Sequence, residues 1–219
     1  MAALGVLAAL AFPASGDGAL RWLGPTLVGQ HATLAEPAPV DDVFAVLSDP
    51  AGGLASGRMP ASGQIVAAQL EGVVALTAGP PLNAVDPKFH LQDLAPAGGH
   101  YRVKATSGFL SLPTSSHPGA SAQTRITTVH PVNLCVRRGD LVGFTTDGGF
   151  APGRYPHGLP FQVFANVAGA RTGRYVAGGG VGNNAVDAFT PLANTLLLMR
   201  VELATGRNGS GVCPGATGR

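Results

Sequence analysis

The sequence predicts an all-β fold: a two-sheet antiparallel β-sandwich, jelly-roll-like, with about nine to eleven short strands and little helix. Three observations lead to this prediction. The 32 glycine and 18 proline residues are spread along the chain, which suits short strands joined by frequent turns. Several runs alternate apolar and polar residues with the period of two of a half-buried strand. No stretch shows the periodicity of a long amphipathic helix.

Composition limits the class of protein. A chain of 219 residues is long enough for one substantial core, and β-sandwiches of this size commonly form a single domain. The chain has 45% hydrophobic and only 12% charged residues, which argues against disorder. The net charge is +2 and the basic residues are scattered without interleaved aromatic residues. We therefore expect no nucleic-acid partner.

The first residues resemble the apolar core and cleavage region of a signal peptide. Met1–Phe12 is almost wholly apolar, and Pro13–Gly16 adds small residues after it. The run is too short to cross a bilayer as a helix, so we expect no transmembrane span. We therefore divide the chain into a signal-peptide-like segment, residues 1–16, and a single β-sandwich domain, residues 17–219, and expect a secreted or cell-surface protein. The alternative is a buried N-terminal helix.

The segment Asn133–Thr145 predicts two short strands joined by a tight turn. Gly139 can adopt a positive φ without steric cost, and Asp140 can accept hydrogen bonds from nearby backbone amides. Together they fit the loop of a hairpin with a glycine bulge. The same turn spells Arg-Gly-Asp, a cell-adhesion tripeptide, but turn chemistry explains these residues fully.

Two further regions carry strong strand patterns. Gln64–Leu76 is the longest β-like run, and Gly72 in its middle predicts a bulge in one bent strand. Phe89–Gln92 and Tyr101–Ala105 alternate on either side of the turn Pro96–Gly99, which predicts a second hairpin.

The last strand is expected at Asn194–Ala204, with Met199 and Val201 facing inward and Arg200 and Glu202 facing outward. Such alternation is typical of a strand with one face on the core.

The two cysteines, Cys135 and Cys213, are expected to form a disulfide bond in an exported protein. This bond would tie the C-terminal tail to the segment around residue 135. The alternative is two free thiols, one of them buried. Neither cysteine has a spacing suited to zinc or redox chemistry.

Four segments together resemble uncharacterised secreted β-sandwich proteins of high-GC actinobacteria. They are Pro131–Val136, Arg138–Phe144, Pro160–Ala165, and the last strand with Val212–Pro214 after it. The resemblance covers roughly residues 55 to 215. It implies this fold and export, and it implies no activity.

Motifs for catalysis or metal binding are missing from the sequence. There is no Gly-x-Ser-x-Gly elbow, no acidic pair for glycoside hydrolysis and no phosphate-binding loop. No His-x-His pair with a downstream glutamate marks a cupin-type site, and His90 and His100 are either a facing pair on the second hairpin or two solvent-facing histidines. We therefore expect no catalytic residue, no resident cofactor and no enzyme activity.

Calcium is the one metal that we consider. Oxygen-bearing side chains lie in two glycine-rich loops, and hard cations prefer such ligands. The weak candidates are Asp147, Asn183, Asn184 and Asp187. The alternative is that they are ordinary turn residues.

Aromatic residues in or beside irregular loops are the candidates for ligand binding. Tyr155 and His157 lie in a glycine- and proline-rich segment, and Tyr175 precedes another. Aromatic faces suit sugars and other amphipathic ligands. The alternative is that these side chains pack the loops against the core.

Two functions remain from this reasoning. The first is a secreted or cell-surface structural or interaction protein that contacts other surface proteins or copies of itself, which the low charge and positive mean hydropathy favour. The second is an extracellular carbohydrate- or cell-wall-binding module. A hydrolase is a third, weaker hypothesis.

Overall fold

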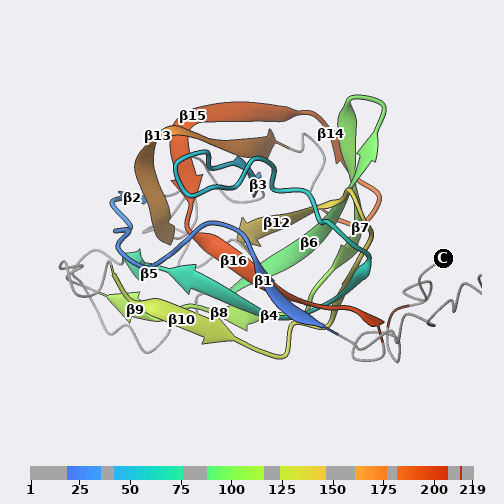
Figure 1. The fold of residues 1–219 in the computed structure, drawn as a ribbon, viewed down its shortest axis with the longest axis horizontal. Coiled ribbons are helices and arrows are strands. Elements are labelled where there is room, and N and C mark those ends of the chain that lie inside the picture. Colours follow the sequence, from blue (N-terminus) through green and yellow to red (C-terminus); the bar gives the residue numbers. More distant parts are fainter. Residues whose placement is uncertain are drawn as a thin grey trace, which may run out of the picture.

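The computed structural model describes residues 19–35, 42–75, 88–115, 124–146, 161–176, 182–206 and 213, and these residues fold into two β-sheets (Figure 1). The prediction of an all-β, two-sheet fold is confirmed. The described residues contain sixteen strands, more than the predicted nine to eleven, because two of the predicted runs are split at a change of sheet and four of the strands are two-residue pairings. Within the described ranges no long apolar helix of the kind that crosses a bilayer occurs.

The first sheet, sheet A, has five antiparallel strands in the order β1-β16-β4-β10, with β11 also paired to β4. β4, β10, β1 and β16 cross the lower half of Figure 1. The bounds are β1 Leu20–Leu23, β16 Met199–Ala204, β4 Gly63–Glu71, β10 Ile126–Val129 and β11 Leu134–Val136.

The second sheet, sheet B, has eleven strands along the path β14-β7-β6-β12-β3-β13-β5-β9, with β15 and β2 paired to β13 and β8 paired to β6. Every pair is antiparallel except β5 with β9. The bounds are β2 Leu34–Ala35, β3 Asp42–Ser48, β5 Val73–Ala75, β6 Lys88–Ala97, β7 His100–Thr106, β8 Leu110–Ser111, β9 Thr114–Ser115, β12 Leu141–Thr146, β13 Phe161–Val176, β14 Val186–Asp187 and β15 Phe189–Leu197.

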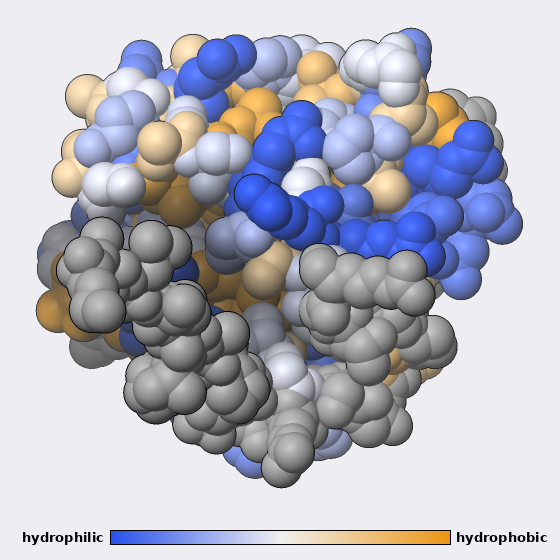
Figure 2. Space-filling view, turned by 45° about the vertical axis from the view of Figure 1, so that its right-hand side comes forward, coloured by the Kyte–Doolittle hydropathy of each residue, from blue (hydrophilic) through white to orange (hydrophobic). Residues whose placement is uncertain are grey.

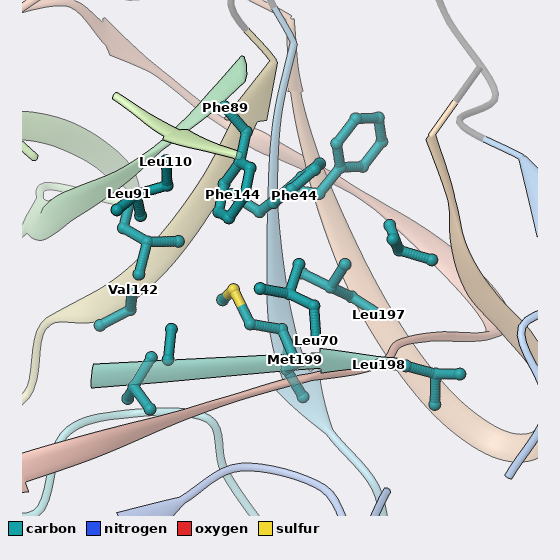
Figure 3. Close-up of a cluster of buried hydrophobic side chains, with 14 of the residues drawn as sticks. Phe44, Leu70, Phe89, Leu91, Leu110, Val142, Phe144, Leu197, Leu198 and Met199 are labelled. Carbon is teal, nitrogen blue, oxygen red and sulfur yellow. The ribbon is translucent and has the colours of Figure 1, made fainter. Parts of the chain in front are cut away.

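The main core fills the space between the sheets. Phe44, Phe89 and Phe144 come from three strands of sheet B and face Leu70 and Met199 from sheet A (Figure 3). The ring centroids of Phe89 and Phe144 are 5.2 Å apart, and Phe89 and Phe144 also contact Phe161. Burial of each such ring contributes about 2–3 kcal/mol, so this cluster dominates the packing of the two sheets.

A second, smaller core lies on the opposite face of sheet B. In β3, Phe44 points into the main core, whereas its neighbours Val43 and Ala45 point the other way, as alternation requires. Tyr175 is completely buried in this second core, where its ring lies 6.0 Å from that of Phe189. The centre of sheet B is therefore covered on both faces.

The chain passes from one sheet to the other at three short connections. Gly72 separates β4 of sheet A from β5 of sheet B, so the prediction of one bent strand with a bulge at this glycine is wrong: the run is two strands in different sheets. Leu198 separates β15 from β16, so the run expected as one final strand is two. Residues 137–140, called the crossing turn below, join β11 to β12.

The prediction of a hairpin at Asn133–Thr145 is wrong. The turn forms as expected, with Gly139 at φ 90° and the amide of Arg137 donating a hydrogen bond to Asp140 Oδ2 at 2.9 Å. However, β11 pairs with β4 in sheet A, whereas β12 pairs with β3 and β6 in sheet B. Each strand therefore pairs within a different sheet, and the turn links the two layers of the sandwich.

The second predicted hairpin is confirmed. β6 and β7 pair antiparallel around Gly98 and Gly99. The histidines of this hairpin do not face each other, because His100 lies opposite Ala97 and His90 lies opposite Thr145 of β12. The facing-pair interpretation of these histidines is therefore wrong.

The predicted disulfide bond between Cys135 and Cys213 is present. It joins residues 78 positions apart, with their Cα atoms 5.5 Å apart. Cys135 lies in β11, so the bond holds Cys213 at sheet A.

Replacing Gly72 with alanine is expected to lower the free energy of unfolding by about 2–4 kcal/mol. Gly72 has φ 128°, and a Cβ there would overlap the carbonyl oxygen of Gln162. Gly108→Ala is the matched control, because a Cβ at that position meets no atom within 4 Å. Equal unfolding midpoints in urea for the two variants would contradict this account of the crossing.

Loss of the disulfide in a Cys135→Ser/Cys213→Ser variant is expected to lower the free energy of unfolding by about 4 kcal/mol. The closed loop spans 78 residues, and its closure restricts the unfolded chain. Denaturant unfolding with and without a reductant checks this. The wild type should respond to the reductant and the variant should not, and identical midpoints under all four conditions would contradict the expectation.

Candidate functional site: a pocket between the sheets

A pocket with a volume of about 210 Å³ opens between the two sheets. Sheet A supplies β1 and β16, sheet B supplies β3 and β12, and residues 54–60, called the pocket loop below, close one side. The lining is largely apolar and includes Leu23, Val46, Met59, Val142, Met199 and Val201. These side chains come from the same faces that form the main core, so the pocket is an opening into the edge of that core.

The pocket loop is held close to sheet B. The amide of Gly57 donates to the carbonyl of Leu47 at 2.9 Å, and a Cβ at Gly57 would overlap the carbonyl oxygen of Val46. Asp49 and Leu54 exchange two backbone hydrogen bonds that close the preceding turn. Glycine at position 57 therefore lets the loop approach β3 closely.

The crossing turn supports the pocket loop from the other side. The amide of Met59 donates to the carbonyl of Asp140 at 2.8 Å, and the amide of Gly139 donates to the carbonyl of Met59 at 2.9 Å. The amide of Arg138 donates to Ser62 Oγ at 3.0 Å. The loop and the turn thus form one hydrogen-bonded unit beside the pocket.

Arg58 stands at the pocket with its side chain fixed by neutral partners. Its Nη1 donates to the carbonyl of Gly139 at 2.8 Å, and its Nη2 donates to the hydroxyl of Tyr101 at 2.8 Å. Its guanidinium carbon lies 5.5 Å from the centroid of the Tyr101 ring. Because neither partner is a carboxylate, the positive charge is not neutralised, but neither partner lines the pocket and Tyr101 packs against the second core.

Arg21 is the second cation at the pocket. It lies in β1 opposite Leu203, on the same strand face as the pocket residue Leu23. Its side chain is exposed and has no hydrogen-bond or ion-pair partner among the described residues. Arg21 is therefore free to meet a ligand.

Arg200 also borders the pocket, but its charge lies elsewhere. Its neighbour Met199 faces the core, so alternation directs Arg200 to the outer face of sheet A. There its Nε donates to Gln69 Oε1 at 2.8 Å, and its guanidinium carbon lies 5.1 Å from the Trp22 ring centroid. Arg200 thus borders the pocket through its backbone, which packs against Gly24.

Asp140 of the crossing turn and Asp93 of β6 form a buried pair of carboxyl groups. Both residues are about 5% exposed or less, and neither lines the pocket. Burial, followed by the hydrogen bond to Asp140 and its negative charge, raises the pKa of Asp93 to about 8. Asp93 is therefore a neutral donor to Asp140 near pH 7, and the pair stabilises the turn instead of forming an accessible acid–base site.

The predicted ligand-binding residues do not coincide with this pocket. Tyr155 and His157 lie outside the described residues. Tyr175 is completely buried in the second core, and burial together with the charge of Asp187 raises its pKa. Its placement matches the packing alternative, in which the ring holds neighbouring segments against sheet B.

The candidate calcium ligands that the structure describes also lie outside the pocket lining. Asp147 lies outside the described residues. Asn183 Oδ1 accepts a hydrogen bond from Thr106 Oγ1 at 3.0 Å, Asp187 Oδ1 accepts one from the amide of Ala188 at 2.7 Å, and Asn184 has φ 74°. Among the described residues no group of three or more His, Cys, Asp or Glu side chains is placed to hold a metal ion.

The adhesion interpretation of Arg-Gly-Asp finds no support in the geometry of the turn. The side chain of Asp140 is buried, and it accepts the hydrogen bond from the amide of Arg137 within the turn. An adhesion motif needs that carboxylate exposed, whereas here it stabilises the turn.

Comparison of the chain with protein-family models, with curated proteins and with solved structures found no match.

Sequence reasoning did not identify the pocket. Arg21 lies in a four-residue strand, too short for its alternation to be distinguished from chance, and Arg58 lies in a turn-rich segment. Their side chains meet the same cavity because β1 pairs with β16, a strand nearly 180 positions later in the chain. A pairing at this separation leaves no local pattern in the sequence.

Asp93→Asn is expected to change how stability depends on pH. The folded-state pKa of Asp93 is about 8, above its ordinary value of 3.8, so folding takes up a proton between these values and wild-type stability falls as pH rises through this window. An asparagine amide still donates to Asp140 but cannot ionise. The variant should match the wild type near pH 4 and exceed it by at least about 1 kcal/mol above pH 8.

The check is the difference between variant and wild-type unfolding free energies from pH 4 to 9. Subtraction removes the contribution of Glu71, whose burial raises its pKa to about 7. Glu202→Gln, on the partly exposed side of β16, controls for loss of a carboxylate. A flat difference curve for Asp93→Asn would contradict the proton-sharing pair.

Proposed function

We propose that this protein is an exported β-sandwich binding module that acts by holding a ligand in the pocket between its sheets, without catalysis. The observation that carries the proposal is the pocket itself. It is concave, its walls are apolar, and a few polar groups stand at its edge, the usual composition of a small-ligand site.

Export is part of this proposal. A disulfide that closes a long loop is typical of proteins in oxidising compartments. The signal-peptide-like character of residues 1–16 and the resemblance to secreted actinobacterial β-sandwich proteins agree with this location.

The size of the pocket limits what it can take. A volume of about 210 Å³ holds one side group or a small molecule and not a length of polymer. If the ligand is a cell-wall polymer or glycan, the pocket receives one substituent of it, and the rest of the polymer lies on the surface.

Apolar side chains on the surface favour a second function, interaction with other surface proteins or with copies of itself. Phe109 is 60% exposed. The centroid of its ring lies 4.5 Å from that of the His90 ring and 5.1 Å from Lys88 Nζ. Figure 2 shows one face of the molecule, where apolar areas in orange adjoin broader hydrophilic areas in blue. Such scattered apolar residues are common on monomers, so this function is the weaker of the two.

The methionines offer a direct test of the binding function. The chain has three methionines, and Met59 and Met199 both line the pocket. With ¹³C-methyl-methionine labelling, a panel of glycans, cell-wall fragments and small amphipathic compounds is screened by NMR. A ligand in the pocket should shift both methyl signals together and to saturation.

Ser56→Trp should abolish those shifts, because Ser56 is an exposed residue of the pocket loop and a bulky ring there blocks entry. Ser56→Ala, which only removes the hydroxyl that accepts from the Arg58 amide, should retain them. If no compound in the panel moves either signal in well-folded wild type, the binding proposal fails. Concentration-dependent association in light scattering would then favour the interaction function.

A further inference from the structure

We propose that the ligand of this pocket is a small amphipathic anion: a carboxylate or phosphate monoester on an apolar body of about six to eight heavy atoms. This inference rests on the proposed binding function and specifies its ligand class.

The volume and lining of the pocket define the apolar body. An apolar cavity of about 150 Å³ is known to hold benzene, so about 210 Å³ accepts a ring or a short alkyl chain of slightly larger size. Met59 and Met199 line the pocket, and their flexible thioethers adapt to apolar groups of different shapes. Val46 and Val142 complete the wall from sheet B.

The charges at the pocket define the anionic head. No carboxylate is among the described residues that line it, whereas three arginines are: Arg21, Arg58 and Arg200. Arginine forms paired hydrogen bonds with carboxylate and phosphate oxygens, and these are stronger than bonds between neutral groups. An anion whose apolar part fills the pocket thus meets positive charge, and no carboxylate of the described lining competes with it for the arginines.

Arg58 lines the pocket, but the carbonyl of Gly139 and the hydroxyl of Tyr101 hold its guanidinium. Neither of these groups lines the pocket, so Arg58 adds positive charge near the opening and Arg21 supplies the direct contact with the anion. Arg21 has no such anchor among the described residues and is expected to close on the ligand.

Two other arginines do not offer an equivalent site. Arg174 is paired with Asp42, whose Oδ2 lies 2.6 Å from the Arg174 Nε. Arg200 is engaged on the outer face of sheet A by Gln69 and Trp22. Arg21, by contrast, has no hydrogen-bond or ion-pair partner among the described residues and stands beside an accessible apolar wall.

The experiment uses full-length, methyl-labelled protein and matched probes. Hexanoate and phenylacetate are titrated against their neutral amides, hexanamide and phenylacetamide, while phenyl phosphate tests the phosphate head and acetate and inorganic phosphate test the anion without an apolar body. The readout is the saturable shift of the Met59 and Met199 methyl signals, assigned with Met59→Leu and Met199→Leu.

We expect at least one amphipathic anion to bind about tenfold or more tightly than its amide, and acetate and inorganic phosphate to bind more weakly still. Arg21→Gln should weaken the anion about tenfold and leave the amide unchanged, with Arg21→Lys in between. Arg102→Gln, an exposed arginine of β7 that does not line the pocket, should have no effect. A tighter phenyl phosphate than phenylacetate would assign the head as phosphate, and the reverse would assign it as carboxylate.

Different results would overturn the anion inference and the binding function. If amides and anions bind equally and Arg21→Gln changes neither, the pocket binds apolar groups without regard to charge, and the anion inference is overturned while the binding function stands. If acetate or inorganic phosphate binds as tightly as hexanoate, the apolar body has no role and the inference is also overturned. If no probe shifts either methionine signal, both proposals fail.

Discussion

The chain passes between two sheets, and the fold requires that each backbone amide buried at such a passage has a hydrogen-bond partner. At each of the three connections a backbone amide of the crossing has a hydrogen-bond acceptor: Gly72 donates to Arg125, Leu198 donates to Val163, and Asp140 donates to Arg137. A buried amide without a partner costs about 1–3 kcal/mol, so these bonds make short crossings possible. Short crossings in turn keep the sheets close enough for the phenylalanine cluster to fill the space between them.

The crossing turn also determines the shape of the pocket. Its residues bind the pocket loop through Met59 and fix the side chain of Arg58 through the carbonyl of Gly139. Asp140 of the turn pairs with Asp93 of β6, and this pair of acids joins the turn to sheet B. A perturbation of this turn therefore reaches both the stability of the sandwich and the position of the arginine at the pocket.

Much of the fold followed from local patterns, and the failures have a common cause. The β6–β7 hairpin and the disulfide were predictable, because alternation around a glycine turn and an even number of cysteines are strong signals. The glycine at position 72 marked an irregularity, but it did not show that the chain changes sheet there. The hairpin expected at Asn133–Thr145 was wrong because alternation shows that a segment is a strand but not which strand it pairs with. The candidate ligand residue Tyr175 is buried for a related reason: strand β13 lies in the centre of sheet B, and its position there comes from pairings with β3 and β15.

By itself, the sequence determined that this chain is an all-β protein with its strands in particular places, because apolar alternation and glycine-rich turns act over a few residues. Tertiary structure decided which strands share a sheet, which strands are buried on both faces, and where a pocket remains open. Arg21 and Arg58 line one cavity because β1 adds to the edge of sheet A beside β16 while the pocket loop packs on β3. That arrangement comes from pairings between strands far apart in the sequence, so no local segment contains the information for it.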